Sequence, residues 1–219
     1  AYRPKPMIED QWKPMVAYLQ KALSQSVQIT FYDYDELNTA IEESRLDVVL
    51  TNPGHFVLLQ HRYSLSAPIA TQITQHGDQE VAAFGGAIIA RSDARAINSL
   101  DDLAGKRIAI TGTFSLGGYQ MQAFEMLEAG LALPDARQLL VLGMPHDNVA
   151  RAILAGKADV GFLRSGAMES MARDGTLDLT RLKVINRQNL PAFPFAVSTR
   201  LYPEWPVAVL PHVSEHLSR

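Results

Sequence analysis

The chain has 219 residues, and its 47% hydrophobic and 20% charged residues indicate a soluble globular protein of one large domain or two smaller ones. The formal net charge is −3 and the Lys and Arg residues are scattered, so the basic stripe that a nucleic-acid partner requires is missing. There are no cysteines, which excludes disulfides, thiolate metal ligands and cysteine nucleophiles.

No apolar run of the sequence reaches the roughly 18–20 residues that span a bilayer. The longest run, Val81–Ala90, is interrupted by two glycines and is predicted to be a strand. The chain opens without the basic and apolar leader of a signal peptide and stops inside an apparent helix. We therefore expect a piece of a longer protein, and the missing anchor does not indicate a cytoplasmic one.

The first part of the chain predicts helices and strands in alternation. Apolar residues recur at helical spacing over 12–23, and 27–31 alternates like a half-buried strand. Asp33 with Glu36 matches a capping box that opens a helix, and the strand 46–50 follows. This order is typical of a parallel sheet covered by helices.

The remainder of the chain resumes the alternation. A one-turn helix is predicted at Ser99–Lys106, capped by Ser99 and ended by Gly105. The other predicted elements are strands at 85–90, 107–110, 139–142, 160–163, 182–185 and 195–198, and helices at about 118–129, at about 147–155 and around Met168 and Met171. Strands and helices thus alternate in two blocks that are joined by extended segments. This pattern predicts an α/β fold of two lobes with a cleft.

Two turns each launch a helix directly after an apolar strand. The first is Leu50–Phe56, and the second is Gly112–Gln120. A helix N-terminus presents unpaired N–H groups and the positive end of the helix dipole, which suits an anionic ligand. Two such ends on two halves of one chain predict a binding clamp rather than an enzyme.

The first turn contributes Asn52 and His55 as candidate ligand-binding residues. It follows the carboxyl end of a strand, where α/β sheets bind ligands. An ordinary turn has the same pattern, because a polar cap and a proline at the first helical position, here Pro53, are common. Both interpretations stay open.

The second turn carries the stronger pattern. Gly117 and Gly118 at a helix start weaken the helix by up to about 1 kcal/mol each relative to Ala, which is understandable where the backbone must approach a ligand closely. Thr113 and Ser115 supply hydroxyls, and Tyr119 lies on the first turn. The segment lacks the Lys-Ser/Thr ending of a P-loop and the dinucleotide fingerprint, which disfavours a nucleotide.

Three further residues are candidates for contact with an anion. His146 opens a helix after a strand, and it is either a donor to an oxyanion or only an N-terminal helix residue. Arg164 ends the strand 160–163, where a guanidinium can bind an oxyanion bidentately or form a salt bridge between elements. Arg3, in the loop before the first helix, is a second candidate cation or a plain surface residue.

Enzymatic interpretations are disfavoured. The segment His212–His216 matches the H-x-x-E-H zinc pattern, but such short patterns occur by chance and only three residues follow it to supply a third ligand. Ser115 lies in G-T-F-S-L-G, which lacks the G-x-S-x-G spacing of a nucleophile elbow. We expect no catalytic residue, no metal site and no cofactor in this domain.

Five motifs are spread over nearly the whole chain. They are D-x-x-x-x-N-P at Asp47–Pro53, S-L-x-D-L-x-G-K-R at Ser99–Arg107, a Ser/Gly turn at Ser115–Gly118, a helix-opening His146, and A-x-x-x-G-x-x-D-V-G at Ala152–Gly161. Together they resemble the phosphonate-binding-protein-like (PhnD-like) group of type II periplasmic binding proteins.

Four longer segments restrict the resemblance to one branch of this group. They are Leu50–His55, Ser115–Gln120, Gly161–Ser165 and Ser198–Pro206, of which the last is the most specific. They are similar to the extracytoplasmic sensor domains of bacterial histidine kinases of the tetrathionate-sensor type. Transporter-type relatives carry a Ser-Thr-Ser-Gly turn, from which this chain departs at Leu116-Gly117, and Arg164 fits the sensor branch better.

The resemblance implies a type II Venus-flytrap fold. Lobe 1 would hold residues 1–82, joined by the C-terminal segment 207–219, and lobe 2 residues 83–206. The ligand would lie in the cleft between the lobes. The residues that would bridge it are Asn52 and His55 on one side and Ser115, Tyr119, His146 and Arg164 on the other.

The resemblance also implies a function. The chain would be the periplasmic sensor domain of a membrane-anchored, dimeric two-component histidine kinase that signals to a response regulator. It would bind a small anionic solute such as a phosphonate, a sulfur oxyanion or a carboxylate. The alternative is a free periplasmic solute-binding protein of a phosphonate- or phosphite-type ABC transporter.

Overall fold

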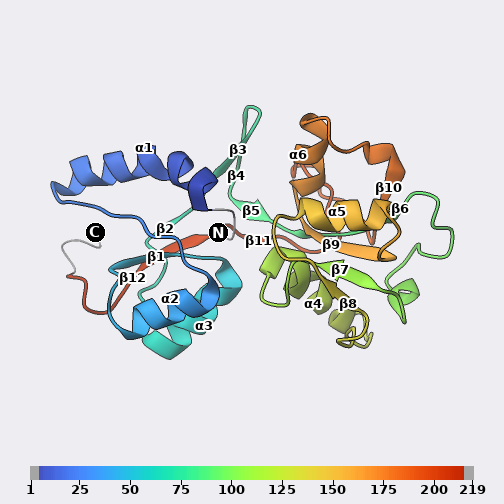
Figure 1. Ribbon diagram of the computed structural model, residues 1–219, viewed down its shortest axis with the longest axis horizontal. Helices are drawn as coiled ribbons and strands as arrows, with labels where there is room; N and C mark the ends of the chain where they lie inside the picture. The colour runs from blue at the N-terminus through green and yellow to red at the C-terminus, as the bar shows by residue number, and fades with distance from the viewer. Residues whose placement is uncertain (1–4, 215–219) are drawn as a thin grey trace. The chain divides into compact units, whose positions relative to one another are not determined.

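The computed structural model describes residues 5–214, apart from the side chains of residues 5–9 and 11. Contacts divide the chain into two compact units, whose helices and strands Figure 1 labels. Unit 1 is Ala1–Thr51, His55–Thr71 and Trp205–Arg219, and unit 2 is Asn52–Gly54 and Gln72–Glu204. The lobes expected from the sequence change over at residues 82/83 and 206/207, so their bounds differ from those of the units, and they remain a prediction.

Three helices start within the described residues 5–63: α1 (Lys5–Leu23), α2 (Tyr34–Glu42) and α3 (Pro53–Tyr63). The predicted capping box at the start of α2 is confirmed. Asp33 Oδ1 accepts the Glu36 N–H at 2.8 Å, and Glu36 Oε2 accepts the Asp33 N–H at 3.0 Å. Behind this cap, Ile41 of α2 is buried in the apolar core of unit 1 with Leu59 of α3.

The sheet of unit 1 is antiparallel in its described part, so the predicted parallel sheet is wrong here. Its strands lie in the order β1 (Val48–Leu50), β12 (Pro206–Val209) and β2 (Ala70–Thr71). The central strand β12 comes from the C-terminal part of the chain. Local spacing of residues cannot reveal such a pairing, because the partners are more than 130 residues apart.

The strand predicted at Val27–Phe31 is also wrong. The segment joins no strand ladder, and Gln28, Ile29 and Thr30 are exposed. A strand requires a neighbour that pairs with its N–H and C=O groups, and alternating apolar residues do not supply one.

Unit 2 is built on a five-stranded mixed sheet. Its strands lie in the order β10 (Leu182–Ile185), β6 (Gly86–Arg91), β9 (Val160–Arg164), β7 (Ile108–Ile110) and β8 (Leu139–Val141). Strand β7 runs parallel to β8 and β9, whereas β6 pairs antiparallel with β9 and β10. The three parallel strands therefore end at one edge of the sheet, where the turn Gly112–Gln120 begins, where His146 follows β8 and where Arg164 ends β9.

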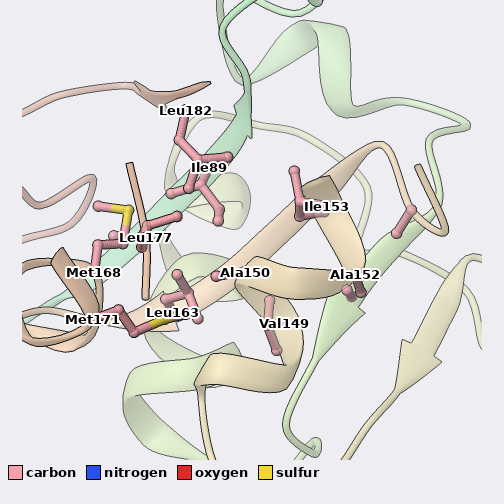
Figure 2. Packing of buried hydrophobic residues seen from close by; sticks show 13 residues of the cluster. Ile89, Val149, Ala150, Ala152, Ile153, Leu163, Met168, Met171, Leu177 and Leu182 are labelled. Carbon is pink, nitrogen blue, oxygen red and sulfur yellow. The ribbon is translucent and has the colours of Figure 1, made fainter. Parts of the chain in front are cut away.

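Helices cover both faces of this sheet, and they are α4 (Met121–Glu128), α5 (Asp147–Leu154) and α6 (Ala167–Arg173). On one face Val149 of α5 and Met168 of α6 pack with Ile89 (Figure 2). On the other face Met126 of α4 packs with Ile88. Neighbouring residues of β6 thus belong to opposite cores, which is the two-residue alternation of a strand buried on both sides.

Shorter elements complete unit 2. They are the hairpin of β3 (Thr74–His76) and β4 (Gln79–Val81), the pair of β5 (Ala83–Phe84) and β11 (Tyr202–Pro203), a π-helical turn at Leu116–Gln120, and 3₁₀ turns at Asp101–Leu103 and Leu179–Arg181. No helix in the part of the chain that the structure describes is long and apolar enough to cross a bilayer.

Two local predictions in unit 2 are wrong. Residues 195–198 form no strand, although the Ser198 N–H donates to the Gly86 carbonyl at 2.8 Å. The cap at the one-turn helix is reversed, because Asp102 Oδ2 accepts the N–H groups of Asn98 and Ser99 at 2.8 and 2.9 Å. The carboxylate acts as the acceptor there, and the Ser99 hydroxyl also donates to it.

Candidate functional site

The turn after β7 is the centre of the candidate site. Ser115 has an extended backbone and its Oγ accepts the Gly118 N–H at 3.1 Å, so it caps the helical turn that comes next. That turn is π-helical over Leu116–Gln120: the Gln120 N–H reaches back to the Ser115 carbonyl at 3.1 Å. Single π-helical turns are rare and frequently lie at functional sites.

Three polar side chains converge on Gly118. A Cβ added to this glycine would lie 2.5 Å from Thr111 Oγ1, 2.8 Å from Ser115 Oγ and 2.9 Å from His146 Cε1. No side chain fits in this space, so the Gly118 backbone packs directly against three polar side chains. We call Thr111, Ser115, Gly118 and His146 the Gly118 cradle.

Thr111 was not among the residues predicted from the sequence. The residue is 7% exposed, and its hydroxyl is buried without a hydrogen-bond partner among the described residues. Buried hydroxyls are nearly always bonded, so an unbonded one beside a capped helix start requires an explanation. Its place directly after the strand 108–110 was the available signal.

His146 precedes α5 and follows the carboxyl end of β8. Its Nδ1 lies 3.4 Å from the backbone N–H of Arg164, which is long for a hydrogen bond. An acceptor role for Nδ1 places the proton of the neutral ring on Nε2. The His146 ring lies against Gly118, so the structure brings His146, Ser115 and Gly118 together in one cradle.

Arg164 ends β9, and its guanidinium forms an ion pair with Glu204. The Glu204 side chain is 1% exposed and that of Arg164 is 27% exposed. The guanidinium also lies over the Phe84 ring, 4.2 Å from its centroid. The salt bridge that the sequence left open is thus present, and the role of Arg164 as an anion ligand stays a prediction.

Glu204 belongs to the long segment Ser198–Pro206, which the sequence marked as specific without giving a reason. Ser198 Oγ accepts the Ile88 N–H at 2.7 Å and donates to the Ile185 carbonyl at 2.6 Å. Thr199 Oγ1 accepts the Gly86 N–H at 2.9 Å. The two hydroxyls thus bind backbone groups of β6, and the segment then carries Glu204 to the side chain of Arg164.

His55 lies in unit 1, at the start of α3, and is 9% exposed. Its Nδ1 is 3.0 Å from Thr51 Oγ1 and its Nε2 is 3.2 Å from Asn38 Oδ1, while the Tyr34 ring contacts it edge-on. Burial disfavours the charged imidazolium and lowers the pKa of His55 to about 4. Both ring nitrogens have protein partners, and a ligand role for His55 remains a prediction.

The other predicted residues are dispersed. Thr113 is exposed, and Tyr119 is half-buried with its ring 6.4 Å from that of Phe162. Gly117 lies against Arg164, because a Cβ added to it would be 3.1 Å from Arg164 Cβ. Asn52 is buried and clusters with unit 2.

Two of the sequence patterns extend beyond the described residues. Arg3 lies outside them. The disfavoured zinc pattern reaches His212, whose Nε2 is 3.0 Å from Asp47 Oδ1, but its Glu215 and His216 also lie outside the described residues. Among the side chains that the structure describes, no group of three or more His, Cys, Asp or Glu is placed to hold a metal ion.

The sequence is similar to proteins of two kinds. It is 25% identical over all 219 residues to the tetrathionate sensor histidine kinase TtrS of Salmonella typhimurium, and it spans 37% of that protein. It is 24% identical to the phosphate-import protein PhnD of Mycolicibacterium smegmatis over 202 residues, which are 88% of this chain and 62% of that one. The chain thus spans between about one third and two thirds of these relatives.

A solved structure shows the same fold. The protein XAC2383 from Xanthomonas citri, bound to ATP, superposes with a TM-score of 0.73 at 21% identity, covering 95% of this chain and 75% of that one. Residues 2–219 match the family described as the periplasmic substrate-binding protein of phosphonate ABC transporters. The fold is therefore the mixed α/β fold of the type II periplasmic binding proteins, and the chain is an extracytoplasmic ligand-binding domain. It belongs to the phosphonate-binding family of periplasmic substrate-binding proteins.

Proposed function

We propose that this chain is the ligand-binding sensor domain of a two-component histidine kinase and that it takes a small anionic solute. The observation that carries the proposal is the match to a sensor kinase over all 219 residues, including the segment Ser198–Pro206. In the full-length protein we expect a membrane anchor, a dimer and a kinase that signals to a response regulator.

The Gly118 cradle supports an anionic ligand. The hydroxyls of Thr111 and Ser115 lie at a helix start and are donors that need no counter-charge, whereas the Gly118 N–H is bonded to Ser115 Oγ. The His146 ring lies against the same glycine. Because Arg164 is already paired with Glu204, we infer that neutral donors hold the anion in this unit and that the guanidinium is a minor contributor.

Signalling requires that the ligand prefer one conformation of the sensor. A solute can shift an equilibrium only by its difference in affinity for the two states. The predicted partners Asn52 and His55 would supply that difference if they contact the ligand in one state only. The test is whether Asn52→Ala weakens the response to ligand more than it weakens ligand binding.

A thermal-shift panel tests the ligand class. The panel contains tetrathionate, thiosulfate, sulfate, phosphate, phosphite, methylphosphonate and small carboxylates. An anion at about 100 times its dissociation constant adds about 2.7 kcal/mol of stability, which raises the melting temperature by several degrees. We expect one class of anion to do so, and a panel in which no anion raises the melting temperature would contradict the proposal.

Two matched variants test whether the anion that raises the melting temperature binds at the Gly118 cradle. Gly118→Ala places a methyl group in the Gly118 cradle, whereas Gly112→Ala places the same group in open space with no atom within 4 Å. We expect Gly118→Ala to abolish the shift and Gly112→Ala to keep it. Equal shifts in both variants would exclude the cradle as the anion site.

The second candidate function is a free solute-binding protein of an ABC transporter. It is favoured by the family itself and by the similarity to a phosphate-import protein over 88% of this chain. The two functions differ in the segment that the reading frame encodes after residue 219. A transmembrane helix and a kinase there would establish the sensor, and a stop codon after a short tail would establish the transporter component.

A further inference from the structure

Gln122 is a fully buried polar side chain on α4 that the Gly118 cradle does not include. Its Nε2 donates to the carbonyl of Gly117 at 2.8 Å and to that of Leu163 at 2.9 Å. The carbonyl of Ala87 lies 3.4 Å away. One side-chain amide therefore joins the π-helical turn to β9 and lies beside β6.

The amide is held tightly against the sheet. A Cβ added to Gly86 would lie 2.4 Å from Nε2 and 2.6 Å from Cδ of Gln122, so only a glycine at position 86 leaves room for it. Its Oε1 is buried with no hydrogen-bond partner among the described residues. An unbonded buried acceptor destabilises a fold, so an apolar side chain would serve packing better at this position. The polar amide needs another explanation.

Its two bonds explain it. The C=O and N–H of a trans peptide point in opposite directions. Because Gln122 holds the Gly117 carbonyl, the N–H of the same peptide, that of Gly118, is directed away from Gln122 and toward Ser115 Oγ. The second bond fixes the carbonyl of Leu163, the residue before Arg164. Gln122 thus acts on both the Gly118 cradle and the end of β9.

We propose that Gln122 is a positioning residue, which orients the Gly117–Gly118 peptide so that the Gly118 N–H is presented to the cradle. The consequence for affinity rests on the function proposed for the chain, whereas the orientation of the peptide does not.

The experiment is amide hydrogen exchange of the ¹⁵N-labelled chain, without ligand, in wild type and in Gln122→Met. Methionine keeps the length of the side chain and removes the donor. We expect exchange at Gly118 to rise at least tenfold relative to that at Ile110 of β7. Met126→Ala, which opens the core on the same helix, is the control. Met126→Ala should accelerate amide exchange at Gly118 and at Ile110 by the same factor, because it lowers overall stability only.

Hydrogen exchange of Gln122→Glu over a series of pH values gives a measurement that a change in packing alone would not alter. Burial beside carbonyl oxygens raises the pKa of a carboxyl group. At pH 8 the ionised group repels the Gly117 carbonyl, and at pH 5 the protonated group can donate one hydrogen bond to it. The ratio of protection at Gly118 to that at Ile110 should therefore recover as the pH falls. Ratios equal to wild type in both Gln122 variants would overturn the proposal.

Titration with phosphate and tetrathionate distinguishes a failure of the positioning role from a failure of the proposed anion-binding function. If neither anion binds wild type but Gly118 is deprotected in Gln122→Met, the positioning role stands and the anion site does not. If an anion binds wild type and Gln122→Met with equal affinity, and Gly118 exchange is unchanged, the site stands and the positioning role is wrong.

Discussion

Two buried polar clusters, one in each unit, differ in how completely the protein satisfies them. In unit 1 both nitrogens of His55 lie within hydrogen-bond distance of protein oxygens, those of Thr51 and Asn38. In unit 2 the hydroxyl of Thr111 is buried beside the capped start of a helical turn, with no hydrogen-bond partner among the described residues. A satisfied cluster stabilises its unit, whereas an unsatisfied one costs stability unless a group from outside bonds to it.

Removal of one member of the Arg164–Glu204 pair has the largest expected effect on stability. This substitution tests whether unit 2, like unit 1, contains a buried polar cluster whose groups are paired within the protein. Arg164→Leu leaves the Glu204 carboxylate buried without its guanidinium, which should cost about 3–5 kcal/mol. The double variant with Glu204→Leu should recover most of this loss. Hydrogen exchange in β7 and β9 measures the stability of unit 2, and single losses that simply add would contradict the pairing.

Protonation of His55 breaks the satisfied cluster of unit 1. The pKa is about 4 in the folded chain and about 6.5 in the unfolded one, so the unfolded state binds more protons between these values. The stabilisation is complete above pH 6.5, falls as the pH is lowered toward 4, and amounts to about 3 kcal/mol in all.

Urea unfolding followed by tryptophan fluorescence measures this loss selectively, because Trp12 and Trp205 both belong to unit 1. His55→Gln should flatten the pH dependence between 6.5 and 4. An equally steep loss in that variant would assign the titration to other groups.

Gly118→Ala fills the unsatisfied cluster. Its methyl group would meet Thr111 Oγ1 at 2.5 Å, and such overpacking should destabilise unit 2 by about 1–3 kcal/mol. Gly112→Ala should change stability by no more than about 0.5 kcal/mol, since surface substitutions in open space rarely exceed this. Circular dichroism melts compare the two, and equal melting temperatures would show that the turn moves to accept the methyl group.

Ser115→Ala has the smallest expected effect. It removes the acceptor of the Gly118 N–H and should cost about 1 kcal/mol, as for other N-cap residues. Ser115→Asp restores an acceptor and should recover this stability, but its negative charge should repel an anion. Denaturant melts and the anion panel separate the two effects, and an anion bound equally by Ser115→Asp would place it elsewhere.

Local signals predicted much of the fold correctly. The capping box at Asp33 and the strand at 182–185 were confirmed, because caps and apolar periodicity are properties of neighbouring residues. The insertion of β12 between β1 and β2 was missed, since it joins distant parts of the chain. The strand predicted at 27–31 fails for the same reason, as no partner strand was available to it.

The candidate site was predicted in part. The turn with Ser115 and Gly118 was identified because serine, glycine and a preceding strand mark a helix start in the sequence itself. Thr111, Gln122 and Glu204 were missed, because their roles depend on contacts with residues from other elements. Gln122 gave one faint signal, a polar residue four positions before Met126 on the buried face of a predicted helix.

The central claim is that the Gly118 cradle holds the anion. The most direct measurement is an NMR titration of the ¹⁵N-labelled chain with tetrathionate, phosphate and methylphosphonate, followed at the amides of Ser115 and Gly118. We predict that one of these anions shifts the Gly118 amide in wild type and in Gly112→Ala and has no effect in Gly118→Ala. An anion that binds Gly118→Ala as tightly as wild type would contradict this claim.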